Sequence, residues 1–162
     1  MVPTTKNIAL KILFSIFLLS AFFSCDQKKA AKSVTPKNPD NITFISLSQV
    51  GGSRGRYRII KITEDSITAE KGSTSGKTHA EWAAAMNANT WKQLTSLIRV
   101  KDLDDIKSSP SLQSVDGTDE TFQIRTPKKS HIYVNSYADT LHYGQFQRLK
   151  EQIDKMLPKE YK

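Results

Sequence analysis

The chain has 162 residues, a formal net charge of +8 and a single cysteine, Cys25. A lone cysteine excludes an internal disulfide framework, because disulfides need pairs. The length suits one domain around one hydrophobic core and is too short for two comfortable domains.

Residues 1–24 have the pattern of an export signal. Lys6 and Lys11 flank the start of an uncharged run of twelve residues, ILFSIFLLSAFF (12–23). A membrane-spanning helix needs about 20 apolar residues, so this run is too short to cross a bilayer and fits the hydrophobic stretch of a secretory signal. Removal of residues 1–24 leaves 138 residues with a net charge of +6.

The end of this run, FFSC (22–25), resembles the lipobox of bacterial lipoproteins. The resemblance implies that signal peptidase II cleaves before Cys25 after its thiol has received a diacylglyceryl group. Phe22 stands where leucine is commonest, and Phe23 stands where a smaller residue is usual. The alternative is an ordinary secretory signal followed by a chance cysteine. Lipidation would account for a lone thiol in an exported protein.

Residues 25–40 predict a disordered tether behind the lipidated Cys25. The segment DQKKAAKSVTPKNPD (26–40) carries four lysines, two prolines and one larger apolar residue, Val34. It therefore cannot bury enough surface to offset the entropy of ordering. The alternative is a polybasic segment that binds anionic lipid. An aspartate directly after the lipidated cysteine, here Asp26, can act in some bacteria as an inner-membrane retention signal. No acidic cluster typical of surface export follows. We expect a periplasm-facing anchor in the outer or inner membrane.

Residues 41–162 predict one α+β domain. Alternating apolar residues indicate strands at 42–47 and 56–62, joined by the glycine-rich loop Gly51–Gly55, and a third strand at 67–71. Residues 80–86 alternate weakly and indicate a fourth strand, although their alanines alone would favour a helix. The expected inward side chains of the first two strands are Ile42, Phe44, Leu47, Tyr57, Ile59 and Ile62.

The second half of the domain predicts a helix, two strands and a final helix. Thr90 and Gln93 form a capping-box pattern at a helix start, and TFQIR (121–125) and SHIYVN (130–135) indicate two strands around the turn TPKK. The final helix, 143–157, carries an apolar stripe. We expect a small antiparallel sheet of five to six strands with both helices on one face. The helical stripe consists of Phe146, Leu149, Ile153, Met156 and Leu157.

The segment GSTSGKT (72–78) is similar to the phosphate-binding loop GxxxxGK[ST] but is one residue too short. Three residues instead of four separate Gly72 from Gly76, and the preceding strand is polar at alternate positions. A phosphate loop follows a buried parallel strand and opens a helix. We therefore interpret residues 71–77 as a solvated hairpin loop and expect neither a nucleotide nor a nucleic-acid partner.

Two groups of charged residues are candidate binding sites. Arg54, Arg56, Arg58 and Tyr57 lie next to exposed glycine backbone and could bind an anionic partner, such as a lipid headgroup, a glycan or an acidic protein face. The alternative is ordinary solvated strand charge. The second group surrounds a glycine and is a candidate weak cation site, although it lacks calcium-loop spacing and a plain turn is the alternative. It consists of Asp116, Asp119 and Glu120.

No motif predicts catalysis, a metal or a cofactor. The three histidines, His79, His131 and His142, do not have helical metal-ligand spacing, and acyl-transfer motifs are absent from the sequence. We interpret Trp82 and Trp91 as core residues.

The segments GSRGRY, TWKQL, DGTDE and NSYADT, in this order behind a lipobox, resemble a family of uncharacterised lipoproteins from Gram-negative bacteria. That resemblance implies no activity. The element order is also loosely similar to emfourin-type protease inhibitors, in which a glycine loop follows the first strand. We therefore expect a non-enzymatic, membrane-anchored binding module of the cell envelope. The alternatives are a protease inhibitor that uses the Gly51–Gly55 loop, and a hydrolase without a recognisable motif.

Overall fold

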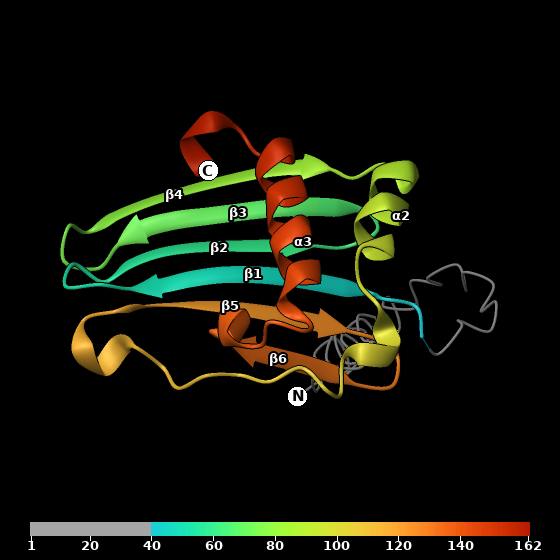
Figure 1. The fold of residues 1–162 in the computed structure, drawn as a ribbon. Coiled ribbons are helices and arrows are strands. Elements are labelled where there is room, and N and C mark those ends of the chain that lie inside the picture. The colour runs from blue at the N-terminus through green and yellow to red at the C-terminus, as the bar shows by residue number, and fades with distance from the viewer. Residues whose placement is uncertain (1–39) are drawn as a thin grey trace, which may run out of the picture. The chain divides into compact units, whose positions relative to one another are not determined.

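The computed structural model describes residues 40–162, which belong to one compact unit. Cys25, the export signal and most of the expected tether lie outside the described residues. The described chain forms six strands, two α-helices and four short 3-10 helices, in the order β-β-β-β-α-β-β-α for the regular elements (Figure 1). This α+β fold confirms the class that the sequence predicts.

The strands form one antiparallel sheet in the order β4-β3-β2-β1-β5-β6. The first four strands follow each other by hairpins, and β5 returns to pair with the free side of β1. The weakly predicted fourth strand is confirmed as a strand. The bounds are β1 Phe44–Gly51, β2 Arg56–Ile62, β3 Ser66–Ser73, β4 Thr78–Ala85, β5 Thr118–Arg125 and β6 Ser130–Val134.

Both α-helices, α2 (Ala88–Ser96) and α3 (Tyr143–Met156), cover the same face of the sheet (Figure 1). The amphipathic stripe of α3 packs on the central strands, and Leu149 and Ile153 are fully buried. Phe146 stacks on Phe122 of β5 with ring centroids 4.6 Å apart. The helices thus supply one wall of a two-layer core, and the strands supply the other.

The structure confirms part of the expected inward set of the first two strands and corrects the rest. Ile42, Leu47 and Ile62 are buried as expected, and Phe44 and Ile59 lie on the other face, where Ile45 and Ile60 take their place in the core. A shift of one residue moves every side chain of a strand to the opposite face of the sheet. Because apolar residues are adjacent in both strands, the sequence pattern alone does not show which of them faces the core.

The start of α2 also differs from the prediction. Asn87, not Thr90, caps the helix, and its side-chain oxygen accepts a hydrogen bond from the Thr90 N–H at 2.8 Å. Asparagine is among the best N-cap residues, so Asn87 begins the helix three residues before the predicted start. The interpretation of Trp91 as a core residue is confirmed, since Trp91 and Leu94 are the buried residues of α2.

Candidate functional site

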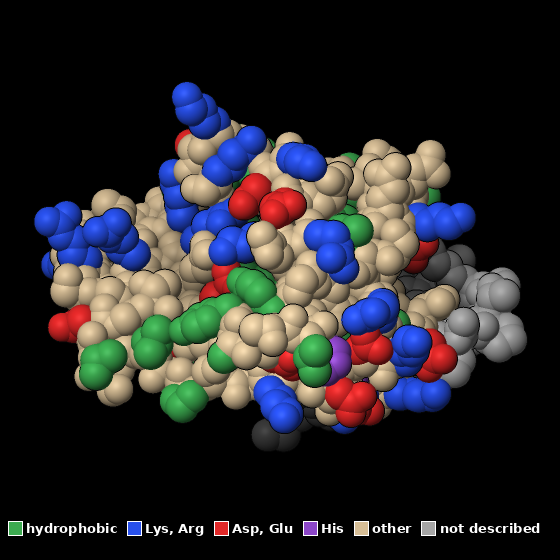
Figure 2. Space-filling model, in the orientation of Figure 1, with side chains coloured by type: hydrophobic (Ala, Val, Ile, Leu, Met, Phe, Trp, Pro, Cys, Tyr) green, Lys and Arg blue, Asp and Glu red, His purple; other side chains and the backbone are tan. Residues whose placement is uncertain are grey.

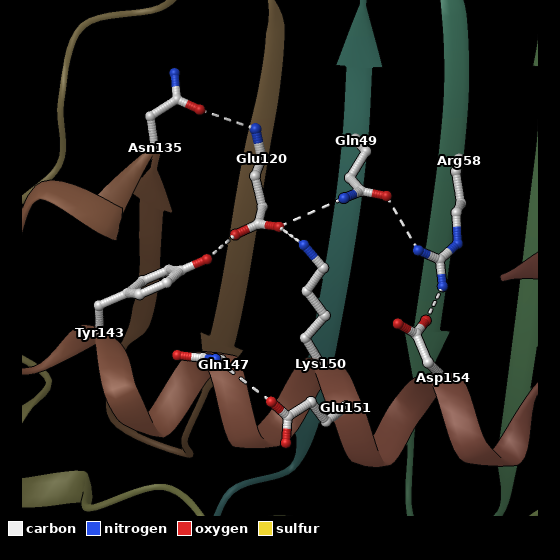
Figure 3. A network of polar contacts seen from close by, with 9 residues as sticks. All are labelled: Gln49, Arg58, Glu120, Asn135, Tyr143, Gln147, Lys150, Glu151 and Asp154. Atoms are coloured by element: carbon white, nitrogen blue, oxygen red, sulfur yellow. Dashed lines mark hydrogen bonds and ion pairs between the residues drawn. The ribbon is translucent and has the colours of Figure 1, made fainter.

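A row of polar side chains lies between α3 and the sheet (Figure 3). The register aligns Glu120 of β5, Gln49 of β1 and Arg58 of β2 across three neighbouring strands. The Gln49 amide donates to Glu120 at 3.4 Å, and the Arg58 Nη1 donates to the Gln49 oxygen at 3.0 Å. Antiparallel pairing therefore turns residues that are far apart in sequence into one continuous chain of hydrogen bonds.

Helix α3 closes this row from above. The Tyr143 hydroxyl donates to Glu120 at 2.7 Å, and Lys150 and Asp154 form ion pairs with Glu120 and Arg58. Burial and the neighbouring Glu120 carboxylate raise the pKa of Tyr143 above its ordinary value, because both disfavour the charged phenolate. These groups satisfy one another's charges and hydrogen-bonding capacity, and the row joins the helix to the sheet.

Beyond the polar row, the helix-covered side of the sheet continues toward the hairpin loops as an open hollow of about 720 Å³. We call this hollow the basic groove. Its lining includes Arg56, Arg58, Lys71, Ser73 and Lys162. Figure 2 shows Lys and Arg side chains over the loop end of the sheet and near the end of the chain. Four cations against Glu160 and the Asp154 carboxylate that pairs with Arg58 leave the groove with a positive potential.

The end of the chain forms one wall of the basic groove. The 3-10 helix η4 (Lys159–Tyr161) is fixed by Arg58, whose Nε donates to the Tyr161 carbonyl at 2.7 Å. Lys71 donates to the Glu160 carbonyl, and its Nζ lies 5.1 Å from the centre of the Tyr161 ring. Trp82 packs against the same ring, with centroids 6.3 Å apart. The wall is thus held by both charge and aromatic contact.

The four residues of the predicted anion site have different roles. Arg54 and Arg56 are exposed, and within residues 40–162 neither guanidinium has a hydrogen-bond or ion-pair partner. Arg58 is occupied by Gln49, Asp154 and Tyr161. Tyr57 alternates to the opposite face, where its hydroxyl lies 2.7 Å from the His79 Nδ1. Two of the four residues therefore remain available to a ligand.

Lys71 and Lys162 are groove residues that the sequence did not single out. Lys71 reaches the groove because the register places it beside Arg58, although the two are far apart along the hairpin. Lys162 reaches it because α3 returns the chain end to this part of the sheet. The sequence around these two lysines does not differ from that around the other lysines of the chain. Only the three-dimensional arrangement, strand pairing for Lys71 and helix docking for Lys162, distinguishes them.

The predicted cation site is not brought together. Asp119 and Glu120 are neighbours on one strand, so their side chains point to opposite faces. Asp119 accepts hydrogen bonds from Ser111, Leu112 and Asn135, and Asp116 is exposed at the end of a 3-10 helix. No group of three metal-ligating side chains occurs in the part of the chain that the structure describes.

The predicted hairpin loop between β3 and β4 is confirmed but is shorter than expected: it spans residues 74–77, because residues 71–73 belong to β3. A strand follows it, where a phosphate-binding loop would open a helix. The loop is bonded to the Gly51–Gly55 loop, because Thr74 N–H donates to the Gly55 carbonyl at 3.0 Å and the Ser73 hydroxyl donates to the Arg54 carbonyl at 2.8 Å. The proposed inhibitory loop is thus fixed by its neighbour, and its inhibitory role stays a prediction.

The histidines occupy three separate environments. His79 contacts Tyr57 and Glu81, and burial lowers the pKa of His131. His142 lies 2.9 Å from Asp139, whose carboxylate also accepts the Lys107 N–H. Within residues 40–162 no hydroxyl is hydrogen-bonded to the His142 ring, so this histidine–carboxylate pair has no nucleophile bonded to it.

In comparisons with known proteins, no family model matches the chain, and no curated protein is significantly similar to it. None of the described helices combines the length and the apolar character that a bilayer crossing requires.

Proposed function

We propose that the chain is a lipid-anchored, non-enzymatic binding protein of the bacterial envelope, and that its domain binds an anionic group in the basic groove. The groove carries the proposal, because its hollow of about 720 Å³ is lined by Arg56 and Lys162, whose cationic groups have no partner within residues 40–162. Ser73 adds a hydroxyl to the lining. Lipidation at Cys25, expected from the sequence, would hold the domain at a membrane.

The position of the fixed cations supports binding over catalysis. Arg58 and Lys71 already bond backbone carbonyls of η4, so they shape the groove and contribute charge without changing partners. Arg56 can add a two-pronged hydrogen bond to a phosphate or carboxylate, which is the geometry that guanidinium groups favour. The anion would therefore meet a prearranged positive surface.

Titration of the full chain in neutral detergent with tripolyphosphate tests this proposal by calorimetry. We expect saturable binding that weakens with added salt, and Arg56→Ala with Lys162→Ala should reduce the affinity roughly tenfold or more, as loss of charge-assisted hydrogen bonds does. The matched control removes two exposed cations of α3, Arg148→Ala with Lys155→Ala. An equal loss in both variants, or no binding by the wild type, would contradict the proposal.

A further inference from the structure

The two edge strands of the sheet, β6 and β4, differ in length and in how far other parts of the chain bond to them. At the β6 edge, the loop before β5 bonds to Val134, whose N–H donates to the Ser108 hydroxyl at 3.0 Å and whose carbonyl accepts the Ser109 N–H at 2.9 Å. β6 is also short, with five residues. β4, at the other edge, is eight residues long. A long edge strand with open hydrogen-bonding groups is a template for another strand.

The free hydrogen-bonding groups of β4 can be assigned from its pairing. Met86 N–H, at the end of the strand, donates to the Asp65 carbonyl at 3.0 Å. Bonded and non-bonded pairs alternate along an antiparallel ladder, so the even-numbered residues of β4 bond to β3. The groups that point away belong to His79, Glu81, Ala83 and Ala85, and the described residues offer them no backbone partner.

β4 also lacks the features that usually protect an edge. Its sequence, THAEWAAA, has no proline or lysine, and its register with β3 continues through all eight residues without a bulge. Three of its last four residues are alanines, which leave room for a neighbouring strand. Its one acidic side chain, Glu81, is paired with His79 at 2.7 Å on the same strand.

We propose that β4 is a self-association edge, which pairs with β4 of a second copy of this chain to form one continuous twelve-stranded sheet across a two-fold axis. The axis passes at Trp82. This arrangement pairs Glu81 with the partner's Ala83 and His79 with the partner's Ala85, and it uses every outward-pointing group of the strand.

Strand β4 is complementary to itself in this register. Trp82, partly buried against the core on the helix-covered side, lies opposite the partner's Trp82 in a non-hydrogen-bonded pair, where cross-strand aromatic contact is favourable. A shift by two residues in one direction would place Glu81 opposite the partner's Glu81, and like charges directly opposite are destabilising. The same shift in the other direction would place Trp82 opposite the partner's Ala84 and lose the aromatic pair. Charge and aromatic packing therefore select the same register.

Sedimentation of the full chain in neutral detergent tests the association. We expect the wild type to sediment as a dimer and Ala83→Lys to sediment as a monomer, because a lysine at this exposed edge position opposes pairing. Ala138→Lys is the matched control and should stay dimeric. It makes the same exchange at an exposed position of the 3-10 helix Ser136–Ala138, which follows β6 at the other edge of the sheet. Ala83→Pro is a second variant, which removes an N–H that points away from β3 and so spares the ladder within the chain.

A monomeric wild type would overturn the proposal, even if the edge then accepted a strand from another protein. A dimer that persists in both Ala83 variants would overturn it as well. Disulfide cross-linking tests the register: co-expressed Glu81→Cys and Ala83→Cys chains should link to each other more than either links to itself. Preferential linkage of Glu81→Cys to itself would overturn the register.

Discussion

Asp119 and Glu120 are adjacent carboxylates with different surroundings. Asp119 accepts hydrogen bonds from the Ser111 hydroxyl at 2.5 Å and the Leu112 N–H at 2.8 Å, so it holds the loop before β5. Glu120 faces α3 and bonds Tyr143. Strand alternation separates the two side chains, and each carboxylate then serves the element that lies on its own face.

The Asp119 contacts predict a pH dependence of stability. Hydrogen bonds from Ser111, Leu112 and Asn135 lower the pKa of Asp119 below its ordinary value. The ionised group therefore stabilises the fold above its unfolded-state pKa of about 3.9, and this contribution is lost as the pH falls through the lower folded-state pKa. Asp119→Asn should lose less stability than the wild type during acidification from pH 6 to pH 3.

Urea unfolding at several pH values, followed by tryptophan fluorescence, measures this difference. Asp116→Asn is the control, because Asp116 is exposed and already has a left-handed backbone, which asparagine tolerates. It should follow the wild type. Equal acid sensitivity of wild type and Asp119→Asn would show that the hydrogen bonds to Asp119 do not link its ionisation to folding.

At the scale of elements, α3 contributes to both the core and the site. One side of the helix buries Phe146, Leu149 and Ile153, and the adjacent side carries Lys150 and Asp154 to the polar row. The helix therefore fixes Arg58, which in turn fixes η4 at the groove wall. Burial of the apolar stripe positions the polar contacts beside it.

Leu149→Ala should reduce the free energy of unfolding by roughly 2–5 kcal/mol, because Leu149 is fully buried and the change leaves a cavity. Chemical denaturation of the full chain measures the loss. Lys155→Ala, at an exposed position of the same helix, should change stability by less than about 0.5 kcal/mol. A loss that small at Leu149 would contradict the assignment of this stripe to the core.

At the scale of the whole molecule, the proposals divide the chain into an anchor, a tether and a domain with two surfaces. The basic groove lies on the helix-covered side, and the proposed self-association edge lies along β4. A dimer with a continuous sheet would display two grooves on the same side, because a two-fold axis perpendicular to the sheet preserves its faces. Two linked grooves would bind a multivalent anion with increased avidity.

The anchor itself is tested at Cys25. Cys25→Ser removes the only thiol of the chain and should abolish incorporation of a clickable palmitate analogue in a bacterial host. The wild type should be labelled and should remain with the membrane fraction after a salt wash, since two or more acyl chains anchor a protein stably. Equal labelling of both chains would argue against the lipoprotein assignment.

The sequence by itself determined the features that depend on near neighbours. Glycines at 51–55 and a polar segment at 71–77 indicated the hairpins, and the 3.6-residue stripe of α3 indicated a helix with one buried side. These patterns were sufficient for the α+β class, since short connections make strands antiparallel and apolar stripes place helices against a sheet.

Only the tertiary structure decided which residues of β1 and β2 face the core and which residues line the candidate site. Packing under the helices selected Ile45 and Ile60 over Phe44 and Ile59, because adjacent apolar residues occupy both faces of each strand and the local pattern did not decide between them. Pairing of β2 with β3 placed Lys71 beside Arg58, and the return of α3 brought Lys162 to the same groove. Such long-range proximity follows from strand register and helix docking, for which the local sequence carries no signal.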